Sequence, residues 1–245
     1  MKLLRLLSLF ALLASGVSCN FTEEIRIQPD GSGFMALRFD GSEMMAVTEM
    51  MDSLPEAAMD SVIYFSDILD EKKDSISRLS AEEQRRLEKL RPYRMHIQSD
   101  PEKASLLFTL ARDFDQISEM GNAFAAFQDA SALDSDAGPG GQNPSEDFHP
   151  ATEVAFSFDN GRFTRRTTIT DSTLHQQQVD SLEGAGMFLS GSTYTLKIQF
   201  PGKVRSATAA DATLSMDGKT LIREVDFLEY LKDPTLLDME VEPYL

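Results

Sequence analysis

The chain of 245 residues has one cysteine, three histidines and no tryptophan. A single cysteine excludes an internal disulfide, so the folded state has to be stabilised by packing rather than by covalent cross-links. Three histidines scattered along the chain do not form the closely spaced ligand sets of zinc sites. Beyond residues 1–18, no apolar stretch approaches the roughly 20 residues that a transmembrane helix needs.

The sequence also lacks the short motifs that mark common active sites. It has no Gly-x-Ser-x-Gly nucleophile elbow, no phosphate-binding glycine loop, no Cys-x-x-Cys pair and no dinucleotide fingerprint. We therefore expect no catalytic residue, no cofactor and no metal ion, and we expect that the protein is not an enzyme.

The N-terminus carries the clearest pattern that is present. Lys2 and Arg5 supply positive charge, residues 3–13 are almost entirely apolar, and small residues follow at positions 14–16. This layout is typical of a signal peptide, and its apolar core is too short to span a bilayer as a stable helix. We assign residues 1–18 as a signal peptide and expect the rest of the chain to be exported.

Cys19 stands at the expected cleavage position. Bacterial lipoproteins carry an obligatory cysteine there, which takes a diacylglycerol on its thiol and becomes the new N-terminus. Each buried methylene contributes about 0.8 kcal/mol, so two or three acyl chains such as palmitate anchor a protein firmly. Val17 and Ser18 suit the positions before such a cysteine, whereas Gly16 departs from the usual branched apolar residue. Two alternatives are ordinary cleavage, which leaves a free or intermolecularly paired thiol, and an uncleaved anchor.

Lipid attachment at Cys19 predicts a location, and the charge of the chain restricts the partners. We expect the protein in a bacterial cell envelope, lipid-anchored to a membrane, with the outer membrane favoured and the membrane face left open. The formal charge is −17, and loss of residues 1–18 leaves 21 basic against 40 acidic side chains, a charge of −19. Such a surface repels phosphate backbones, which argues against nucleic acid as a partner.

Alternation of apolar and polar residues predicts three hairpins and a group of C-terminal strands. The turns of the hairpins contain Pro29-Asp30-Gly31, Asp100-Pro101 and Asn160-Gly161, the last being the strongest short hairpin signal. The expected strands are residues 24–28, 35–39, 95–97, 106–110, 154–158, 163–167, 196–200, 214–216, a stretch from 221 onward, and 237–241.

Helical periodicity predicts the segments that follow the hairpins. Residues 43–91 are expected to be helical up to Pro92, with capping boxes that begin at Ser53 and Ser80. Further helices are expected near residues 115–130, 171–182 and 226–231. The sequence therefore predicts an α+β fold, with antiparallel sheets built from successive hairpins, each followed by a covering helix.

Residues 131–149 interrupt every periodicity and contain Gly138-Pro139-Gly140-Gly141 and Asn143-Pro144. We expect a linker or a long loop there. It divides an N-terminal α+β region, residues 19–130, from a C-terminal α+β region, residues 150–245. The sequence leaves open whether the two regions share one sheet.

A group of methionines lies close together in sequence and concentrates thioether side chains, which are soft metal ligands. Paired thioethers can bind Cu(I), but no histidine or cysteine lies close in sequence to complete a metal site. We interpret the group as flexible apolar filler on a helix face, or as a pliable lining for an apolar ligand. Its members are Met44, Met45, Met50 and Met51.

The remaining polar candidates are isolated. The three histidines show no ligand spacing, and we interpret them as structural or surface residues; they are His96, His149 and His175. Asp134 and Asp136 lack the later ligands of a calcium loop, so we interpret them as part of a solvated linker.

Two pairs of like charges complete the candidates. We interpret Arg165-Arg166 as local charge balance on an exposed strand rather than as an anion site. Glu23-Glu24 lies close enough to Cys19 to act as a sorting signal toward the outer surface, but the start of the first strand is the favoured interpretation.

Two stretches resemble known families. Cys19 followed by the pattern Ile-x-Ile-x-Pro-Asp-Gly-Ser-Gly at residues 25–33 is similar to uncharacterised envelope lipoproteins of Bacteroidota. The run Leu-Lys-Ile-Gln-Phe-Pro-Gly-Lys-Val at residues 196–204, followed by Asp-Gly-Lys-Thr at 217–220, resembles the LppM-type lipoprotein domain. That resemblance implies an α+β envelope domain with suspected lipid or glycolipid binding and no known catalysis, and it transfers no catalytic residues.

Together these features favour a non-enzymatic, membrane-anchored binding or structural module. Apolar residues beneath the helices are expected to line a pocket for an acyl chain or another envelope lipid. One alternative is a structural component of an envelope protein complex. The other is a hydrolase of envelope polymers that uses two facing carboxylates as acid and base.

Overall fold

The structure is a computed structural model that describes residues 20–42, 58–133, 151–189 and 191–244, with only the backbone for residues 131–133 and 182–188. The strands are β1 Asn20–Ile27, β2 Gly33–Asp40, β3 Met59–Tyr64, β4 Arg94–Asp100, β5 Ser105–Phe114, β6 Thr152–Asp159, β7 Arg162–Ile169, β8 Thr193–Gln199, β9 Val204–Ala207, β10 Thr213–Leu214, β11 Thr220–Asp226 and β12 Met239–Pro243. The α-helices are α3 Phe65–Glu71, α4 Lys73–Ile76, α5 Ala81–Glu88, α6 Ala123–Leu133, α7 Ser172–Leu189 and α8 Phe227–Lys232, and the 3-10 helices are η2 Pro101–Lys103, η3 Ile117–Glu119 and η4 Pro234–Leu237.

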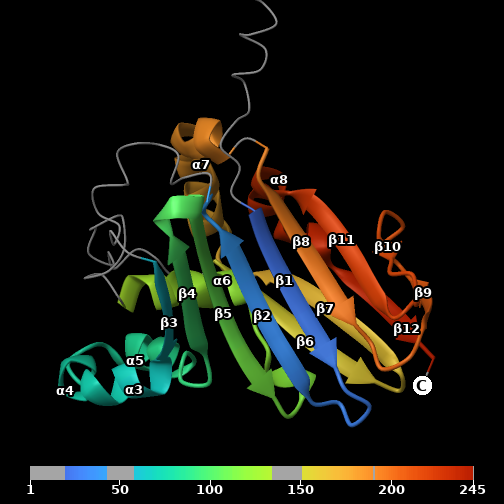
Figure 1. Cartoon of the computed structure of the whole chain (residues 1–245), viewed down its shortest axis with the longest axis horizontal. Coiled ribbons are helices and arrows are strands. Elements are labelled where there is room, and N and C mark those ends of the chain that lie inside the picture. The colour runs from blue at the N-terminus through green and yellow to red at the C-terminus, as the bar shows by residue number, and fades with distance from the viewer. Residues whose placement is uncertain (1–19, 43–57, 134–150, 190, 245) are drawn as a thin grey trace, which may run out of the picture.

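The strands form two sheets, which lie one behind the other in Figure 1. The larger sheet has eight strands in the order β10-β11-β8-β1-β2-β5-β4-β3, and the smaller has four in the order β6-β7-β12-β9. Neighbouring strands are antiparallel except for β1 and β8, which are parallel. The predicted α+β class is confirmed, and the one parallel pair is a departure from a purely antiparallel sheet.

The parallel pair joins distant parts of the chain. Phe21 of β1 is in register with Tyr194 of β8, and Ile25 is in register with Ile198. A parallel pair needs a crossover rather than a tight turn, and here β2 to β7 and α3 to α7 lie between the two strands in sequence. Strands from both sides of residues 131–149 therefore belong to the same sheet.

The three predicted hairpins are present as β1–β2, β4–β5 and β6–β7. The last turns at Asn160 and Gly161, whose φ angles of 52° and 75° are both left-handed. Asparagine and glycine tolerate this conformation, and two such residues make the turn whose twist matches that of the flanking strands.

The prediction that residues 43–91 are helical is wrong for β3. This strand pairs antiparallel with β4 at the edge of the larger sheet, and Val62 on it is 46% exposed. The apolar residues that suggested one helix straddle the boundary at which β3 ends and α3 begins. The box at Ser80 is confirmed, since Glu83 N donates to Ser80 Oγ (3.2 Å) and Ser80 N to Glu83 Oε2 (2.8 Å). The box at Ser53 lies outside the described residues.

The single helix predicted near residues 115–130 is also wrong. Instead β5 continues to Phe114, η3 makes one turn, and Met120 is extended with φ −79° and ψ 150°. Asn122 then starts α6, because its Oδ1 accepts the N–H of Ala125 at 3.0 Å and so caps the new helix. Nearer the C-terminus, α7 extends to Leu189, beyond the predicted end at 182, and Leu237 belongs to η4 rather than to the last strand.

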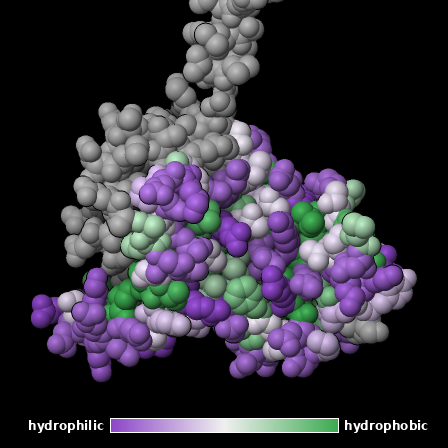
Figure 2. Space-filling view, in the orientation of Figure 1, coloured by the Kyte–Doolittle hydropathy of each residue, from purple (hydrophilic) through white to green (hydrophobic). Residues whose placement is uncertain are grey.

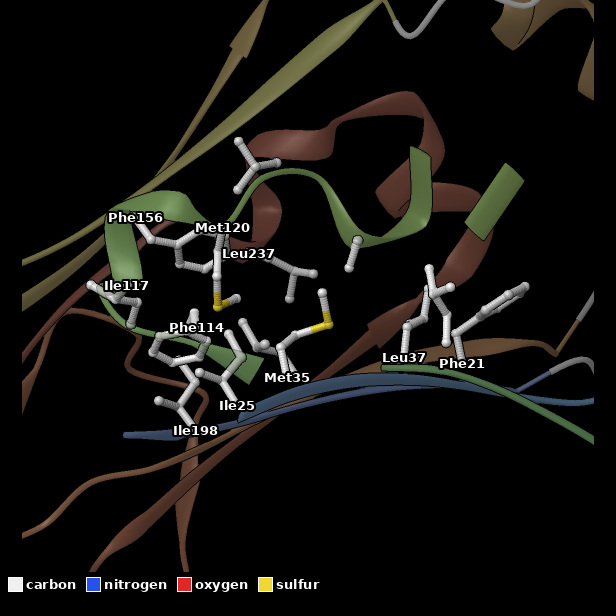
Figure 3. Packing of buried hydrophobic residues seen from close by; sticks show 14 of the residues in the cluster. Phe21, Ile25, Met35, Leu37, Phe114, Ile117, Met120, Phe156, Ile198 and Leu237 are labelled. Atoms are coloured by element: carbon white, nitrogen blue, oxygen red, sulfur yellow. The ribbon is translucent and has the colours of Figure 1, made fainter. Parts of the chain in front are cut away.

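The main core fills the space between the two sheets (Figure 3). The larger sheet contributes fully buried Ile25, Met35 and Leu37, and Phe156 and Met120 pack onto them from the opposite side. The other face of the larger sheet is mostly hydrophilic on the surface (Figure 2). No helix within the described ranges has both the length and the apolarity that a membrane crossing requires.

Candidate functional site

The lipid-attachment residue predicted from the sequence, Cys19, lies outside the described residues. β1 begins at the next residue, Asn20, and is a central strand of the larger sheet. In Figure 1 the start of β1 lies at the end of the sheet beside α7 and α8. Whatever is attached at position 19 is therefore one residue from this end of the fold.

An apolar pocket opens at this end of the fold. We call it the aromatic pocket; it has a volume of about 390 Å³, and its lining residues come from β1, β2, β6, α6, α7, α8 and η4 and from the segments that join them. Pockets of a few hundred Å³ with mainly apolar walls are typical of small-molecule sites. Its apolar lining includes Phe21, Phe39, Phe124, Val179, Phe227 and Leu231.

Phe21 lies at the centre of the aromatic wall. Its ring stacks on Phe39 (4.8 Å between centroids) and on Phe227 (4.6 Å), and Phe124 meets it edge-on at 5.2 Å. Phe124 also meets Phe227 edge-on, at 5.4 Å. Offset-stacked and edge-to-face pairs are the favoured arrangements of aromatic rings, and each adds about 0.5–1.5 kcal/mol beyond area burial. The wall is therefore preformed.

Capping residues set where the three helical walls begin. Asn122 caps α6 as described above, the Oδ1 of Asp171 accepts the N–H of Leu174 at 2.9 Å, and the Oδ1 of Asp226 accepts the N–H of Glu229 at 3.0 Å. Short polar side chains at N-caps satisfy amide groups that a helix leaves unpaired. The local sequence therefore determines the residue at which each of these helices begins.

Two polar contacts lie on the rim of the aromatic pocket. Asn122 Nδ2 donates to Thr152 Oγ1 at 3.1 Å, which connects the start of α6 to β6. His175 Nε2 lies 3.2 Å from the carbonyl of Leu231, and because a carbonyl only accepts, this nitrogen carries the hydrogen. His175 therefore joins α7 to α8, as a structural histidine.

A buried polar cluster lies next to the aromatic pocket. Glu23 is 2% exposed and Arg165 is 1% exposed, and they come from β1 and β7 in different sheets. Tyr194 donates to Glu23 Oε2 at 2.7 Å, and Arg165 contacts Asp238 at 3.3 Å. The ring of Tyr194 packs on Tyr230, which also lines the pocket, at 4.7 Å. The cluster thus connects the pocket wall to both sheets.

Burial dominates the protonation of this cluster. It raises the pKa of Glu23, while the nearby charge of Arg165 and the hydrogen bond from Tyr194 offset part of the effect. Burial and the Glu23 carboxylate raise the pKa of Tyr194 well above its ordinary value. Glu23 Oε1 and Arg165 Nε are buried and have no hydrogen-bond partner among the described residues. A buried polar atom without a hydrogen bond lowers the free energy of unfolding, so this cluster destabilises the core locally.

The interpretation of Arg165 as an exposed residue is wrong. Residues of β7 alternate between its two faces, so Arg165 points inward with Phe163, while Arg166 points outward. The guanidinium of Arg165 lies 5.9 Å from the ring centroid of Phe156, within cation–π range. The side chain of Arg166, by contrast, is 57% exposed and pairs with Glu240, in keeping with local charge balance.

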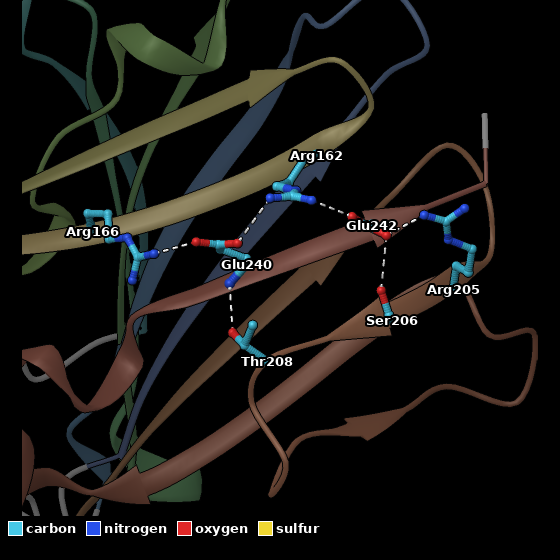
Figure 4. Close-up of polar contacts among 7 residues, drawn as sticks. All are labelled: Arg162, Arg166, Arg205, Ser206, Thr208, Glu240 and Glu242. Carbon is cyan, nitrogen blue, oxygen red and sulfur yellow. Dashed lines mark hydrogen bonds and ion pairs between the residues drawn. The ribbon is translucent and has the colours of Figure 1, made fainter.

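Arg166 belongs to a row of ion pairs on the outer face of the smaller sheet (Figure 4). Arg162 contacts Glu240 at 3.4 Å and Glu242 at 2.7 Å, and Arg205 also pairs with Glu242. Hydrogen bonds from Arg205 and Arg162 lower the pKa of Glu242 to about 2. These arginines are occupied by carboxylates of the chain itself, which leaves them poorly suited to bind an external anion.

The other sequence candidates do not meet at a site. His96 Nε2 contacts Asp60 Oδ1 at 2.6 Å between β4 and β3, and this contact lowers the pKa of Asp60. His149 lies outside the described residues, as do Asp134, Asp136 and the methionine group at positions 44, 45, 50 and 51. Among the described side chains, no group of histidine, cysteine and carboxylate residues is arranged to bind a metal ion.

Sequence reasoning missed Phe21 and Glu23 as site residues, although a signal for both was present. They share the alternation of Ile25 and Ile27, which places all four on the inward face of β1. No comparable signal existed for the pocket as a whole, because its walls come together only through tertiary packing.

Comparisons with known proteins give little further information. No family model matches the chain, and no curated protein matches it. Among solved structures, the NMR structure of the folded domain of LppM from Mycobacterium tuberculosis is similar, with a TM-score of 0.38 and 10% identity over 94% of this chain and 91% of that one. None of these comparisons bears on the resemblance to lipoproteins of Bacteroidota, and the chain has a weak structural resemblance to the LppM domain.

Proposed function

We propose that the protein is a lipoprotein of the bacterial cell envelope, anchored through Cys19, whose folded body binds an acyl chain in the aromatic pocket without catalysing a reaction. The observation that carries the proposal is the preformed pocket of about 390 Å³ with Phe21 in its wall, two residues after Cys19.

The position of the pocket supports this proposal. A lipid on Cys19 would hold the start of β1 at the membrane, and α7 and α8 lie at the same end of the fold (Figure 1). The pocket would then face the bilayer from which a lipid could enter. A pocket at the opposite end of the sheet would lack this access.

The chemistry of the walls fits an acyl chain. Four phenylalanines line the pocket together with Val179 and Leu231, and no Asp, Glu, Lys or Arg is among the described residues that line it. Each methylene transferred from water into such a site contributes about 0.8 kcal/mol, so a chain of several carbons gains useful affinity from burial alone. A strongly polar substrate would gain little from these walls.

Binding of a fluorescent fatty acid to the mature chain, residues 19–245 with Cys19→Ser, tests the pocket. Val179→Trp places a large ring in the aromatic pocket and should weaken binding by at least about tenfold, or roughly 1.4 kcal/mol. Val62→Trp is a matched control, since Val62 is 46% exposed on β3, away from the pocket. Equal binding by both variants would show that the probe does not occupy this site.

Mass spectrometry of the intact protein from its native membrane tests the anchor. We expect residue 19 to be the N-terminus and to carry acyl chains, and we expect Cys19→Ser to release the protein from the membrane fraction. An unmodified Cys19 in membrane-bound protein would contradict this half of the proposal.

A further inference from the structure

A second pocket adjoins the aromatic pocket. It has a volume of about 590 Å³, and we call it the charged pocket. Asn122, Ala125 and Thr152 line both pockets. The 3.1 Å hydrogen bond between Asn122 and Thr152 therefore lies at the boundary between an apolar and a polar compartment. A ligand with one apolar end and one polar end matches this division.

The charged pocket has balanced charges. Among the described residues that line it, acidic and basic residues are equal in number, and they are Arg86, Lys89, Arg112, Glu119, Asp129 and Glu153. This balance is unusual for a chain with a formal charge of −17. The pocket is thus a place where a phosphate would meet less repulsion than on the rest of the surface.

Four of these charges are held in pairs within the protein. Arg112 contacts Glu119 at 3.3 Å, and Arg86 contacts Asp129 at 3.4 Å. Arg112 is 9% exposed, also donates to the backbone carbonyls of Asp113 and Glu119, and lies 5.4 Å from the ring centroid of Tyr93. These pairs form a fixed polar wall rather than a set of free ligands.

The other two charges are available. Lys89 follows α5 and Glu153 lies on β6, both side chains are exposed, and neither makes an ion pair within the described ranges of the chain. One free ammonium and one free carboxylate at the same pocket match a headgroup that carries a negative and a positive charge. A headgroup with only a negative charge would satisfy Lys89 but would leave Glu153 opposed to it.

We propose that the two pockets together bind a single-chain amphiphile with a zwitterionic headgroup of the phosphoethanolamine kind. The acyl chain lies in the aromatic pocket, Lys89 donates to the phosphate, and Glu153 accepts from the ammonium group. This inference rests on the proposed acyl-chain function, and it adds the class of headgroup and the two residues that select it.

The test compares three lauroyl amphiphiles that differ only in the headgroup. Calorimetric titrations of the mature chain with Cys19→Ser would use lauroyl lysophosphatidylethanolamine, lauroyl lysophosphatidic acid and monolauroylglycerol, all below their critical micelle concentrations. We expect the zwitterionic lipid to bind about tenfold more tightly than either of the others, the effect of about one charge-assisted contact.

Charge variants then assign the headgroup contacts. Lys89→Gln should weaken the zwitterionic lipid about tenfold and leave monolauroylglycerol unchanged, and Glu153→Gln should remove the preference for the zwitterionic over the anionic lipid. Lys73→Gln is the matched control, because Lys73 is an exposed lysine on α4 outside the charged pocket.

The outcomes separate the two proposals. Equal affinity for all three lipids, with weaker binding by Val179→Trp, would overturn the headgroup inference and leave the acyl-chain function in place. Tightest binding of the anionic lipid would also overturn the inference, since it would make Glu153 irrelevant. If none of the three lipids binds, the proposed function fails and the inference fails with it.

Discussion

Tyr194 donates a hydrogen bond of 2.7 Å to Oε2 of Glu23, and this contact joins β8 to β1 inside the core. Glu23 is thereby a buried carboxylate in the strand that leads directly from the predicted anchor. Its second oxygen, Oε1, has no hydrogen-bond partner within the described chain, and Arg165 supplies the nearby positive charge. The consequences of this arrangement are measurable in stability.

Glu23 should make stability depend on pH in an unusual direction. Because burial raises the pKa of Glu23 above the unfolded value of 4.5, the folded protein holds, at pH values between these two pKa values, a proton that the unfolded chain has lost. Its contribution to stability is complete below pH 4.5 and is lost as pH rises through the folded pKa. Glu23→Gln should therefore gain stability relative to the wild type as pH rises, in urea denaturation from pH 4 to 7.5.

Glu242 provides a control with the opposite sign. Its pKa is lowered to about 2 in the folded state, so its contribution is present above pH 4.5 and is lost as pH falls toward 2. Glu242→Gln should be destabilised most at neutral pH and should approach the wild type in acid. A Glu23→Gln curve that follows the Glu242→Gln curve would contradict the burial of Glu23.

Arg165 and Arg166 are neighbours in sequence with opposite surroundings. Arg165→Met should cost about 3–5 kcal/mol of unfolding free energy, because it removes the buried cation that contacts Asp238 at 3.3 Å. Arg166→Met removes an exposed ion pair and should cost no more than about 1 kcal/mol. Denaturant titrations measure both, and similar costs for the two variants would show that Arg165 is not buried as described.

Gly33 should not tolerate a side chain. A Cβ there would lie 2.1 Å from the carbonyl oxygen of Arg26 and 2.4 Å from Cζ of Phe114, so backbone as well as a ring would have to move. Gly33→Ala should cost about 1–3 kcal/mol. Gly121→Ala is the control, since its Cβ would meet nothing within 4 Å, and it should change stability by less than about 0.5 kcal/mol.

Asn122 has two roles that substitutions can separate. Asn122→Ala removes both the cap of α6 and the bond to Thr152, and the loss of a cap typically costs about 1 kcal/mol. Thr152→Val removes only the bond at the boundary between the pockets. Thermal denaturation should show the larger loss for Asn122→Ala, and an equal loss for both would place the whole effect at the pocket boundary.

Features that depend on neighbouring residues could be predicted from the sequence. The hairpin at Asn160-Gly161 and the capping box at Ser80 follow from local turn and cap chemistry, and both are present. β3 could not be separated from α3, because apolar residues on either side of Tyr64 match a helical spacing. Tertiary context decides in such cases, and here pairing with β4 makes residues 59–64 a strand.

The candidate site was harder to predict than the fold. Phe21 and Phe227 stack at 4.6 Å although more than 200 positions separate them in the chain. Nothing in the spacing of either residue indicates the other. They meet because β1 pairs with β8 and β8 pairs with β11, the strand that leads into α8. Glu23 and Arg165 could have been placed inward by strand alternation, but their proximity depends on how the two sheets pack.

Paramagnetic relaxation by a spin-labelled single-chain lipid tests the central claim most directly. In amide NMR spectra of the mature chain with Cys19→Ser, a label on the acyl chain should broaden signals from residues 123–126 of α6, 175–181 of α7 and 227–231 of α8, which surround the aromatic pocket. Broadening confined to the outer face of the larger sheet, or no broadening at all, would contradict an acyl chain in this pocket.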